Sequence, residues 1–253
     1  MLALIAVSVI SQVTESRAQE YPTKPIRFLV GNAPGGGTDI VARLTAQKLS
    51  ESLGRPVIVD NRPGATGTVA AMLVAKAPAD GYSILIVTRS SHAIAPALQS
   101  DLPYHPVRDF AAVSLLVTSP NMLLVHPSVP VASVKELVAY AKARPGTLNY
   151  GSSGTGSVGH MAAELFQVVT GTQFAHVPYK GAAPSVNDLL SGRIQLMFIG
   201  PTLVPHVKSK KLKALAMGGS KRLASLEEVP TFAEAGYPEV EAAQWYGVVT
   251  TAG

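Results

Sequence analysis

Cysteine is absent from the 253-residue chain, and only 15% of the residues are charged. The absence of cysteine excludes disulfides, thiol nucleophiles, iron–sulfur clusters and thiolate zinc sites. The histidines stand at none of the spacings that bring two imidazoles onto one ion, so no metal site is expected. No stretch approaches the roughly 20 apolar residues that cross a bilayer, so an integral membrane protein is not expected. A disordered chain is not expected either, because 47% of the residues are hydrophobic.

Positive charge exceeds negative charge only slightly, with 21 Lys and Arg against 16 Asp and Glu and a net charge of +5. The one dense basic cluster lies within residues 208–213 and has no aromatic neighbour. Proteins that bind nucleic acid usually concentrate basic residues on one face and add aromatic side chains for stacking. No nucleic-acid partner is therefore expected, and the charge balance favours the weak attraction of a small anion.

The amino-terminal segment is typical of a secretory signal peptide. Residues 1–10 are almost wholly apolar, and Ser16 and Ala18 place small residues at the two positions that a signal peptidase recognises. We expect residues 1–18 to be the signal peptide and the mature protein to be periplasmic. No Lys or Arg directly follows Met1, so the true start could lie upstream. A short buried helix is the alternative interpretation.

Short β-rich runs alternate with helical segments, which predicts an α/β fold. The expected strands occupy residues 26–30, 56–60, 83–87, 122–125, 148–150, 174–177, 194–199, 212–217 and 245–250. Apolar residues at helical spacing mark residues 39–53, 134–143 and 158–169, and further helices are expected at 71–77 and 186–190. The alternation of strands and helices predicts mostly parallel sheets flanked by helices.

A proline-rich interruption at residues 102–109 indicates a crossover into a second lobe. We expect lobe 1 to comprise residues 19–112 and 226–253, and lobe 2 to comprise residues 113–225. Hinge bending is expected at the crossing segments near residues 111–114 and 223–229.

Two glycine-rich loops follow expected strands and precede expected helices, at residues 32–39 and 151–157. Ligands of open parallel sheets bind at this position, beyond the carboxyl ends of the strands. Glycine lets a ligand approach the backbone, and the free N–H groups of a helix start attract an anion. The first loop has neither the Gly-Lys-Ser/Thr end of a P-loop nor a dinucleotide fingerprint, so no nucleotide is expected. The alternative is a simple helix cap with Thr38 or Asp39 as N-cap.

A third loop, at residues 178–185, has the same position between a strand and a helix. Gly181 and Ala182 leave backbone N–H groups open there, and Tyr179 is placed to form a wall. Lys180 is either a partner for a carboxylate or a solvated surface charge. A smaller polar turn after residue 87 adds the hydroxyl groups of Thr88, Ser90 and Ser91.

Catalytic machinery is not evident in the sequence. Ser157 and His160 lie one helical turn apart, but no Gly-x-Ser-x-Gly pentapeptide occurs, and no carboxylate pair stands in the loops. We therefore expect a binding protein rather than an enzyme.

Five motifs, in order, resemble the substrate-binding proteins of tripartite tricarboxylate transporters, also called the Bug family. They occupy residues 21–26, 34–39, 61–67, 149–157 and 178–181. The resemblance implies a type II-like periplasmic solute receptor with two α/β lobes joined by crossing strands. It would be a monomer without a cofactor that closes on a small carboxylate ligand and delivers it to membrane permease subunits. Candidate ligands are di- or tricarboxylates, amino acids and aromatic acids.

The resemblance also implies which residues bind the ligand. The first-lobe donors would be Gly36, Gly37, Thr38 and Asp39, and the second-lobe donors Ser152, Ser153, Thr155 and Ser157, with Gly181 and Ala182 on the remaining side. Thr88, Ser90 and Tyr179 complete the expected site. Family members usually continue beyond the strand at 245–250 into further helices, so the C-terminal part of lobe 1 is expected to be missing here. The alternatives are a ligand-sensing periplasmic receptor and an exported enzyme acting on a carboxylic acid.

Overall fold

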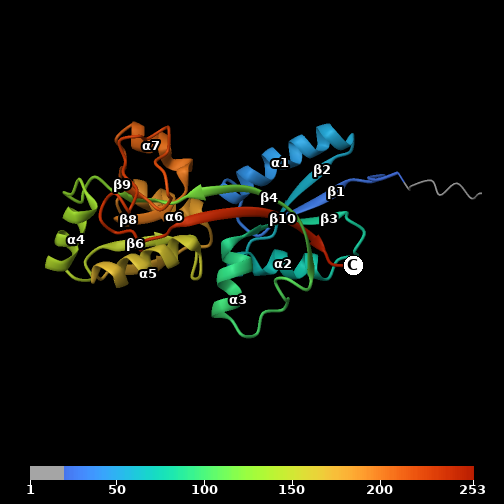
Figure 1. The fold of residues 1–253 in the computed structure, drawn as a ribbon, viewed down its shortest axis with the longest axis horizontal. Helices are drawn as coiled ribbons and strands as arrows, with labels where there is room; N and C mark the ends of the chain where they lie inside the picture. Colours follow the sequence, from blue (N-terminus) through green and yellow to red (C-terminus); the bar gives the residue numbers. More distant parts are fainter. Residues whose placement is uncertain (1–19) are drawn as a thin grey trace, which may run out of the picture.

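Two five-stranded sheets, each with helices packed against it, lie side by side along the long axis of the molecule (Figure 1). The computed structural model describes residues 20–253. The expected signal peptide at residues 1–18 lies outside the described residues. Every helix of the described part is too short or too polar to cross a bilayer.

Sheet A has the strand order β2-β1-β3-β10-β4. Its strands are β1 (Ile26–Val30), β2 (Val57–Asn61), β3 (Ser83–Thr88), β4 (Phe110–Pro120) and β10 (Ala243–Thr251). Strand β1 is parallel to β2 and β3, whereas β10 is antiparallel to both of its neighbours. The helical elements of this half are α1 (Gly37–Leu53), η1 (Ala65–Gly67), α2 (Thr68–Ala75), η2 (Ser90–Ile94) and α3 (Ala95–Leu98).

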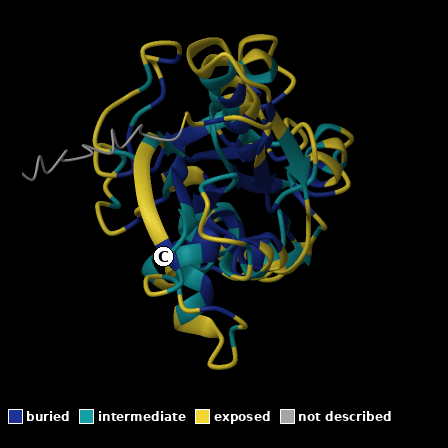
Figure 2. Cartoon of the chain, turned by 90° about the vertical axis from the view of Figure 1, so that its right-hand side faces the viewer, coloured by how far each residue is buried: buried dark blue, intermediate teal, exposed yellow. Residues whose placement is uncertain are grey.

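Neighbouring residues of these strands point to opposite faces, and each face buries its own apolar cluster. Phe28 and Ile86 are clustered with Ala42 of α1, whereas Leu29 and Leu85 are clustered with residues of α2. Sheet A is therefore covered by different helices on its two faces. Most of the edge strand β4 is exposed (Figure 2).

Sheet B has the strand order β7-β6-β8-β5-β9. Its strands are β5 (Met122–Val125), β6 (Asn149–Ser152), β7 (Ala175–Pro178), β8 (Leu196–Ile199) and β9 (Lys213–Met217). Strand β6 is parallel to β7 and β8, and β5 is antiparallel to both of its neighbours. The helical elements here are α4 (Val134–Ala143), α5 (Val158–Thr170), α6 (Ala182–Leu190), η3 (Pro201–Leu203) and α7 (Val204–Lys208). In each sheet four strands thus run one way and one strand runs the other, which confirms the α/β class with mostly parallel sheets.

The chain crosses between the sheets twice, at Asn121 and at Ala242. Asn121 joins β4 directly to β5, and Ala242 precedes β10. The Asn121 amide donates to the carbonyl oxygen of Ala242 at 2.8 Å, and the Gly218 amide donates to the carbonyl oxygen of Asn121 at 2.8 Å. The two crossings are therefore hydrogen-bonded to one another and to the end of β9.

These crossings lie elsewhere than the sequence-based lobe boundaries at 113 and 226. Residues 113–120 belong to β4, which pairs with β10 of sheet A. Leu226, Phe232 and Val240 are buried in the two apolar clusters of sheet B. The expected hinge segments 111–114 and 223–229 thus lie within one lobe each. The strand signal of β4 was missed because its edge position leaves most of its apolar residues exposed, without a buried alternation.

Candidate functional site

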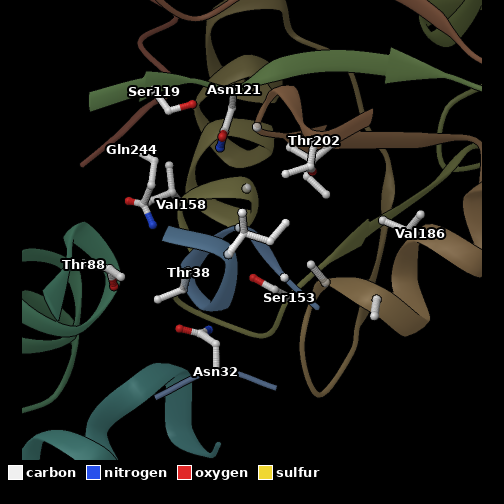
Figure 3. A pocket seen from close by; sticks show the side chains of 18 of the residues that line it. Asn32, Thr38, Thr88, Ser119, Asn121, Ser153, Val158, Val186, Thr202 and Gln244 are labelled. Atoms are coloured by element: carbon white, nitrogen blue, oxygen red, sulfur yellow. The ribbon is translucent and has the colours of Figure 1, made fainter. Parts of the chain in front are cut away.

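A cavity of about 540 Å³ lies where the carboxyl ends of strands from both sheets meet. Asn32 follows β1, Thr38 lies in the first turn of α1, Thr88 ends β3, and Ser153 follows β6. Figure 3 shows these polar side chains around the cavity, with Val158 and Val186 of the second lobe nearby. Both lobes therefore line the cavity, which lies beside the glycine-rich loops at residues 32–39 and 151–157.

The first lobe presents the start of α1 to the cavity. Gly36 is the N-cap residue, and its carbonyl oxygen accepts the first helical hydrogen bond from Ile40 at 3.0 Å. The N–H groups of Gly37 and Thr38 find no acceptor among the described residues, as is usual for the first turn of a helix. Because these donors carry the positive end of the helix dipole, this part of the cavity favours an anion.

The second lobe adds the starts of α5 and α6. Gly159, in the first turn of α5, lines the cavity, and a Cβ atom at this position would lie 2.5 Å from the carbonyl oxygen of Phe198. Only glycine allows α5 to approach β8 this closely. Helix α6 begins after Gly181, whose φ of 117° favours glycine, and Ala182 and Ala183 face the cavity. Helix starts from both lobes therefore surround one space.

Seven of the thirteen expected site residues line the cavity, namely Gly36, Gly37, Thr38, Thr88, Ser90, Ser153 and Ala182. The remaining six, Asp39, Ser152, Thr155, Ser157, Tyr179 and Gly181, lie in or beside the same loops without lining the cavity. Several polar side chains within these loops have other partners.

Asp39 does not line the cavity but holds the first loop in place through hydrogen bonds. Its carboxylate accepts hydrogen bonds from the Gly35 amide at 3.0 Å, from Arg43 Nε at 2.9 Å and from Asn61 Nδ2 at 2.9 Å. Burial by itself would raise the pKa of Asp39, but these hydrogen bonds and the Arg43 charge outweigh it and lower the pKa. Asp39 therefore stays ionised and fixes the loop.

Ser157, Ser152 and Tyr179 also form hydrogen bonds within the protein rather than line the cavity. Ser157 caps α5 by accepting from the His160 amide at 3.3 Å. The buried Ser152 hydroxyl lies 2.7 Å from Nε2 of His176, and the Tyr179 hydroxyl donates to Asp188 at 2.7 Å. These contacts shape the loops and leave the cavity to backbone groups and to other side chains.

One wall of the cavity is formed by the crossing strands and was not predicted from the sequence. Val117 and Ser119 of β4, Asn121 at the crossing, and Gln244 and Tyr246 of β10 all line it. They alternate along each strand, so they share a face. Residues 200–203 also line the cavity and were not predicted. They follow β8 and begin with Gly-Pro before a helix, so they have the same position between a strand and a helix as the predicted loops.

The lining of the cavity is uncharged. Within residues 20–253 it includes no Lys, Arg, His, Asp or Glu side chain, and no cluster of three potential metal ligands is found in that range. The pKa of the Tyr246 hydroxyl is raised, because burial raises it more than the neighbouring Gln244 and Thr38 side chains lower it. Lys180 does not line the cavity. An anion bound here would be held by neutral donors and helix dipoles.

Two α/β lobes with a cavity between them, enclosed by loops from both, are the arrangement of the periplasmic binding protein fold. The sequence model of the tripartite tricarboxylate transporter family receptor matches residues 41–253. The chain belongs to this receptor family.

Individual relatives support the same assignment. BugT of Bordetella pertussis is 39% identical over 238 residues, which are 93% of this chain and 73% of BugT. Rpa4515 of R. palustris, solved with adipate, has a TM-score of 0.89 at 41% identity and covers 92% of this chain and 78% of its own. MatC from Rhodopseudomonas palustris, solved with malate, has a TM-score of 0.86 at 32% identity, with coverage of 92% and 80%. The family and the two-lobed fold expected from the sequence are thereby confirmed.

Proposed function

We propose that this protein is a periplasmic receptor that captures a small carboxylate-bearing ligand between its lobes and delivers it to a membrane permease. One observation carries the proposal: the start of α1 in one lobe and the starts of α5 and α6 in the other face a single cavity without charged side chains. N–H groups at helix starts stabilise a carboxylate, and each hydrogen bond to a charged group contributes about 1.5–3 kcal/mol. The ligands of Rpa4515 and MatC, adipate and malate, are both carboxylates.

Contacts between the lobes support capture by closure. The Thr66 hydroxyl of lobe 1 donates to the carbonyl oxygen of Thr155 in lobe 2 at 2.9 Å. The Val158 amide, at the start of α5, donates to the Ser90 hydroxyl at 3.3 Å. These contacts join the two lobes beside the cavity. Closure would exclude water from the carboxylate and strengthen each of its hydrogen bonds.

The test replaces Gly37 by Val. A Cβ atom at Gly37 would lie 3.1 Å from the Tyr246 hydroxyl and 4.0 Å from Cγ2 of Thr202, so the larger side chain projects into the cavity. Calorimetric titration with the acid that copurifies with the wild-type protein, identified by mass spectrometry, should show at least tenfold weaker binding. Gln47→Val, on an exposed position of the same helix, is the matched control. Unchanged affinity in Gly37→Val would contradict the proposal.

Delivery and the absence of catalysis need separate measurements. Cells that lack this gene should take up the identified acid at a reduced rate, and expression of the wild-type protein should restore uptake. The acid should be recovered chemically unchanged after prolonged incubation with the purified protein. Conversion of the acid into a product would identify an enzyme instead.

A further inference from the structure

The crossing strands place three polar side chains in one part of the cavity, which we call the strand corner: Ser119, Asn121 and Gln244. Ser119 of β4 and Gln244 of β10 are directly paired in the sheet register. Asn121 follows Ser119 by two residues and therefore lies on the same face. Figure 3 shows the three side chains grouped on one side of the cavity, whereas Asn32 and Ser153 lie on another side.

The strand corner has hydrogen-bonding groups without partners. Oε1 of Gln244 is buried and has no hydrogen-bond partner within the described part of the chain. The side chains of Ser119 and Asn121 likewise make no hydrogen bond to other residues in the range 20–253. Buried polar atoms are nearly always paired in native proteins. We therefore expect a ligand to donate a hydrogen bond to an unpaired buried oxygen that lines a cavity.

Space for such a group exists beside Gly200. A Cβ atom at Gly200 would lie 3.7 Å from Oδ1 of Asn121 and 3.7 Å from Oγ of Ser119. The two oxygen atoms thus converge on a position that glycine leaves open. This position is next to side-chain amides and a hydroxyl, which both donate and accept. An ionised carboxylate has no proton to donate to Oε1 of Gln244, whereas a hydroxyl or a carboxamide has one.

We propose that the strand corner is a second subsite, which binds an uncharged hydrogen-bonding group of the ligand, a hydroxyl or a carboxamide, at a distance from its carboxylate. The ligand class is then a monocarboxylic acid that carries such a group. This inference rests on the proposed function, because the helix starts must hold the carboxylate at the same time. A site that pairs with a ligand donor discriminates strongly against analogues that lack it, since its own polar atoms are then left unpaired.

The test uses nine probe acids: the monoamides of butanedioic, pentanedioic and hexanedioic acid, the three corresponding diacids, and butanoic, pentanoic and hexanoic acid. Each is titrated calorimetrically into wild-type protein, into Gln244→Leu and into Gln99→Leu, an identical substitution at an exposed position outside the cavity. For the chain length that fits, the wild-type protein should bind the monoamide at least fivefold more tightly than the methyl-ended acid and the diacid. Gln244→Leu should remove most of this preference, and Gln99→Leu should keep it.

The possible outcomes separate the two proposals. If the acids bind but methyl-ended acids bind as tightly as the monoamides, or the diacids bind most tightly, the inference about the strand corner is wrong and the carboxylate site stands. If none of the nine acids binds, the inference about the strand corner is wrong, and titration with the copurified acid decides the carboxylate site. If Gln244→Leu does not fold, the wild-type preference and the smaller substitution Ser119→Ala decide the matter, because Ser119→Ala should reduce the preference for the monoamide at least threefold.

Discussion

His92 should make lobe 1 less stable in acid. The side chain packs between Tyr104, with ring centroids 5.7 Å apart, and Phe110, at 4.9 Å. Its Nδ1 atom lies 3.0 Å from the Ser91 hydroxyl, but Nε2 is buried without a hydrogen-bond partner among residues 20–253. Burial lowers the pKa of His92 from 6.5 to about 4. The folded protein therefore keeps this imidazole neutral at pH values where the unfolded chain protonates it.

The sign and size of the effect follow from this difference in pKa. Between pH 6.5 and about pH 4 the unfolded state binds a proton that the folded state does not bind, so the free energy of unfolding falls as the pH falls. The loss is about 2 kcal/mol between pH 7 and pH 5, and it approaches about 3 kcal/mol near pH 4. Above pH 6.5 both states are neutral at this position, and the contribution vanishes.

The assay compares wild-type protein with His92→Phe, which retains an aromatic ring in the stack and cannot be protonated. Trp245 is the single tryptophan and packs against the cluster that contains Tyr104 and Phe110, so its fluorescence reports unfolding of this region. Urea unfolding at pH 7 and pH 5 should show a decrease that is about 2 kcal/mol larger in the wild type than in the variant. Equal decreases in both proteins would refute the reasoning, because other titrating groups are common to both.

Three further substitutions test the site and its support. Thr66→Val removes the interlobe hydrogen bond to Thr155, and ligand release measured by stopped flow should become about three- to fivefold faster; an unchanged rate would argue against closure through this contact. Gly159→Ala places a Cβ atom 2.5 Å from the carbonyl oxygen of Phe198, and urea unfolding should show a loss of about 1–3 kcal/mol; an unchanged midpoint would mean that α5 shifts freely. Asp39→Asn removes the charge that anchors the first loop, so faster amide exchange is expected at Gly35, and unchanged exchange would contradict that role.

The positions of most strands and helices could be predicted from the sequence because they depend on local patterns. The apolar run of β5 and the periodicity of α4 match the expected ranges 122–125 and 134–143 without change. The long strand β4 was not predicted, because most of its residues are exposed and it is held in the sheet by pairing with β10, which lies far away in the sequence. Ser119 and Gln244 become neighbours through that pairing, and nothing near either residue in the sequence indicates the other.

The predicted site residues divide into those that line the cavity and those that lie beside it. A glycine-rich loop before a helix signals backbone donors, and Gly36, Gly37 and Thr38 do line the cavity. The same signal does not show how polar side chains within a loop are used. Asp39 accepts from the Gly35 amide of its own loop, and Ser157 accepts from the His160 amide in the first turn of α5, which holds the backbone in position for a ligand. In a loop of this kind the polar side chains build the site, and the main chain forms much of its surface.

We expect the two parts of the proposed site to act in different steps of binding. Ser119 and Gln244 lie on strands of sheet A, the same sheet from which α1 follows β1, so lobe 1 alone brings Gly37 and the strand corner to one cavity. Lobe 2 adds Ser153 and Gly159 from the other side. We expect a ligand to meet the strand corner before closure and the second set of helix starts to reach its carboxylate only on closure. Gln244→Leu should therefore weaken binding to the open protein, whereas Thr66→Val should accelerate opening of the closed complex.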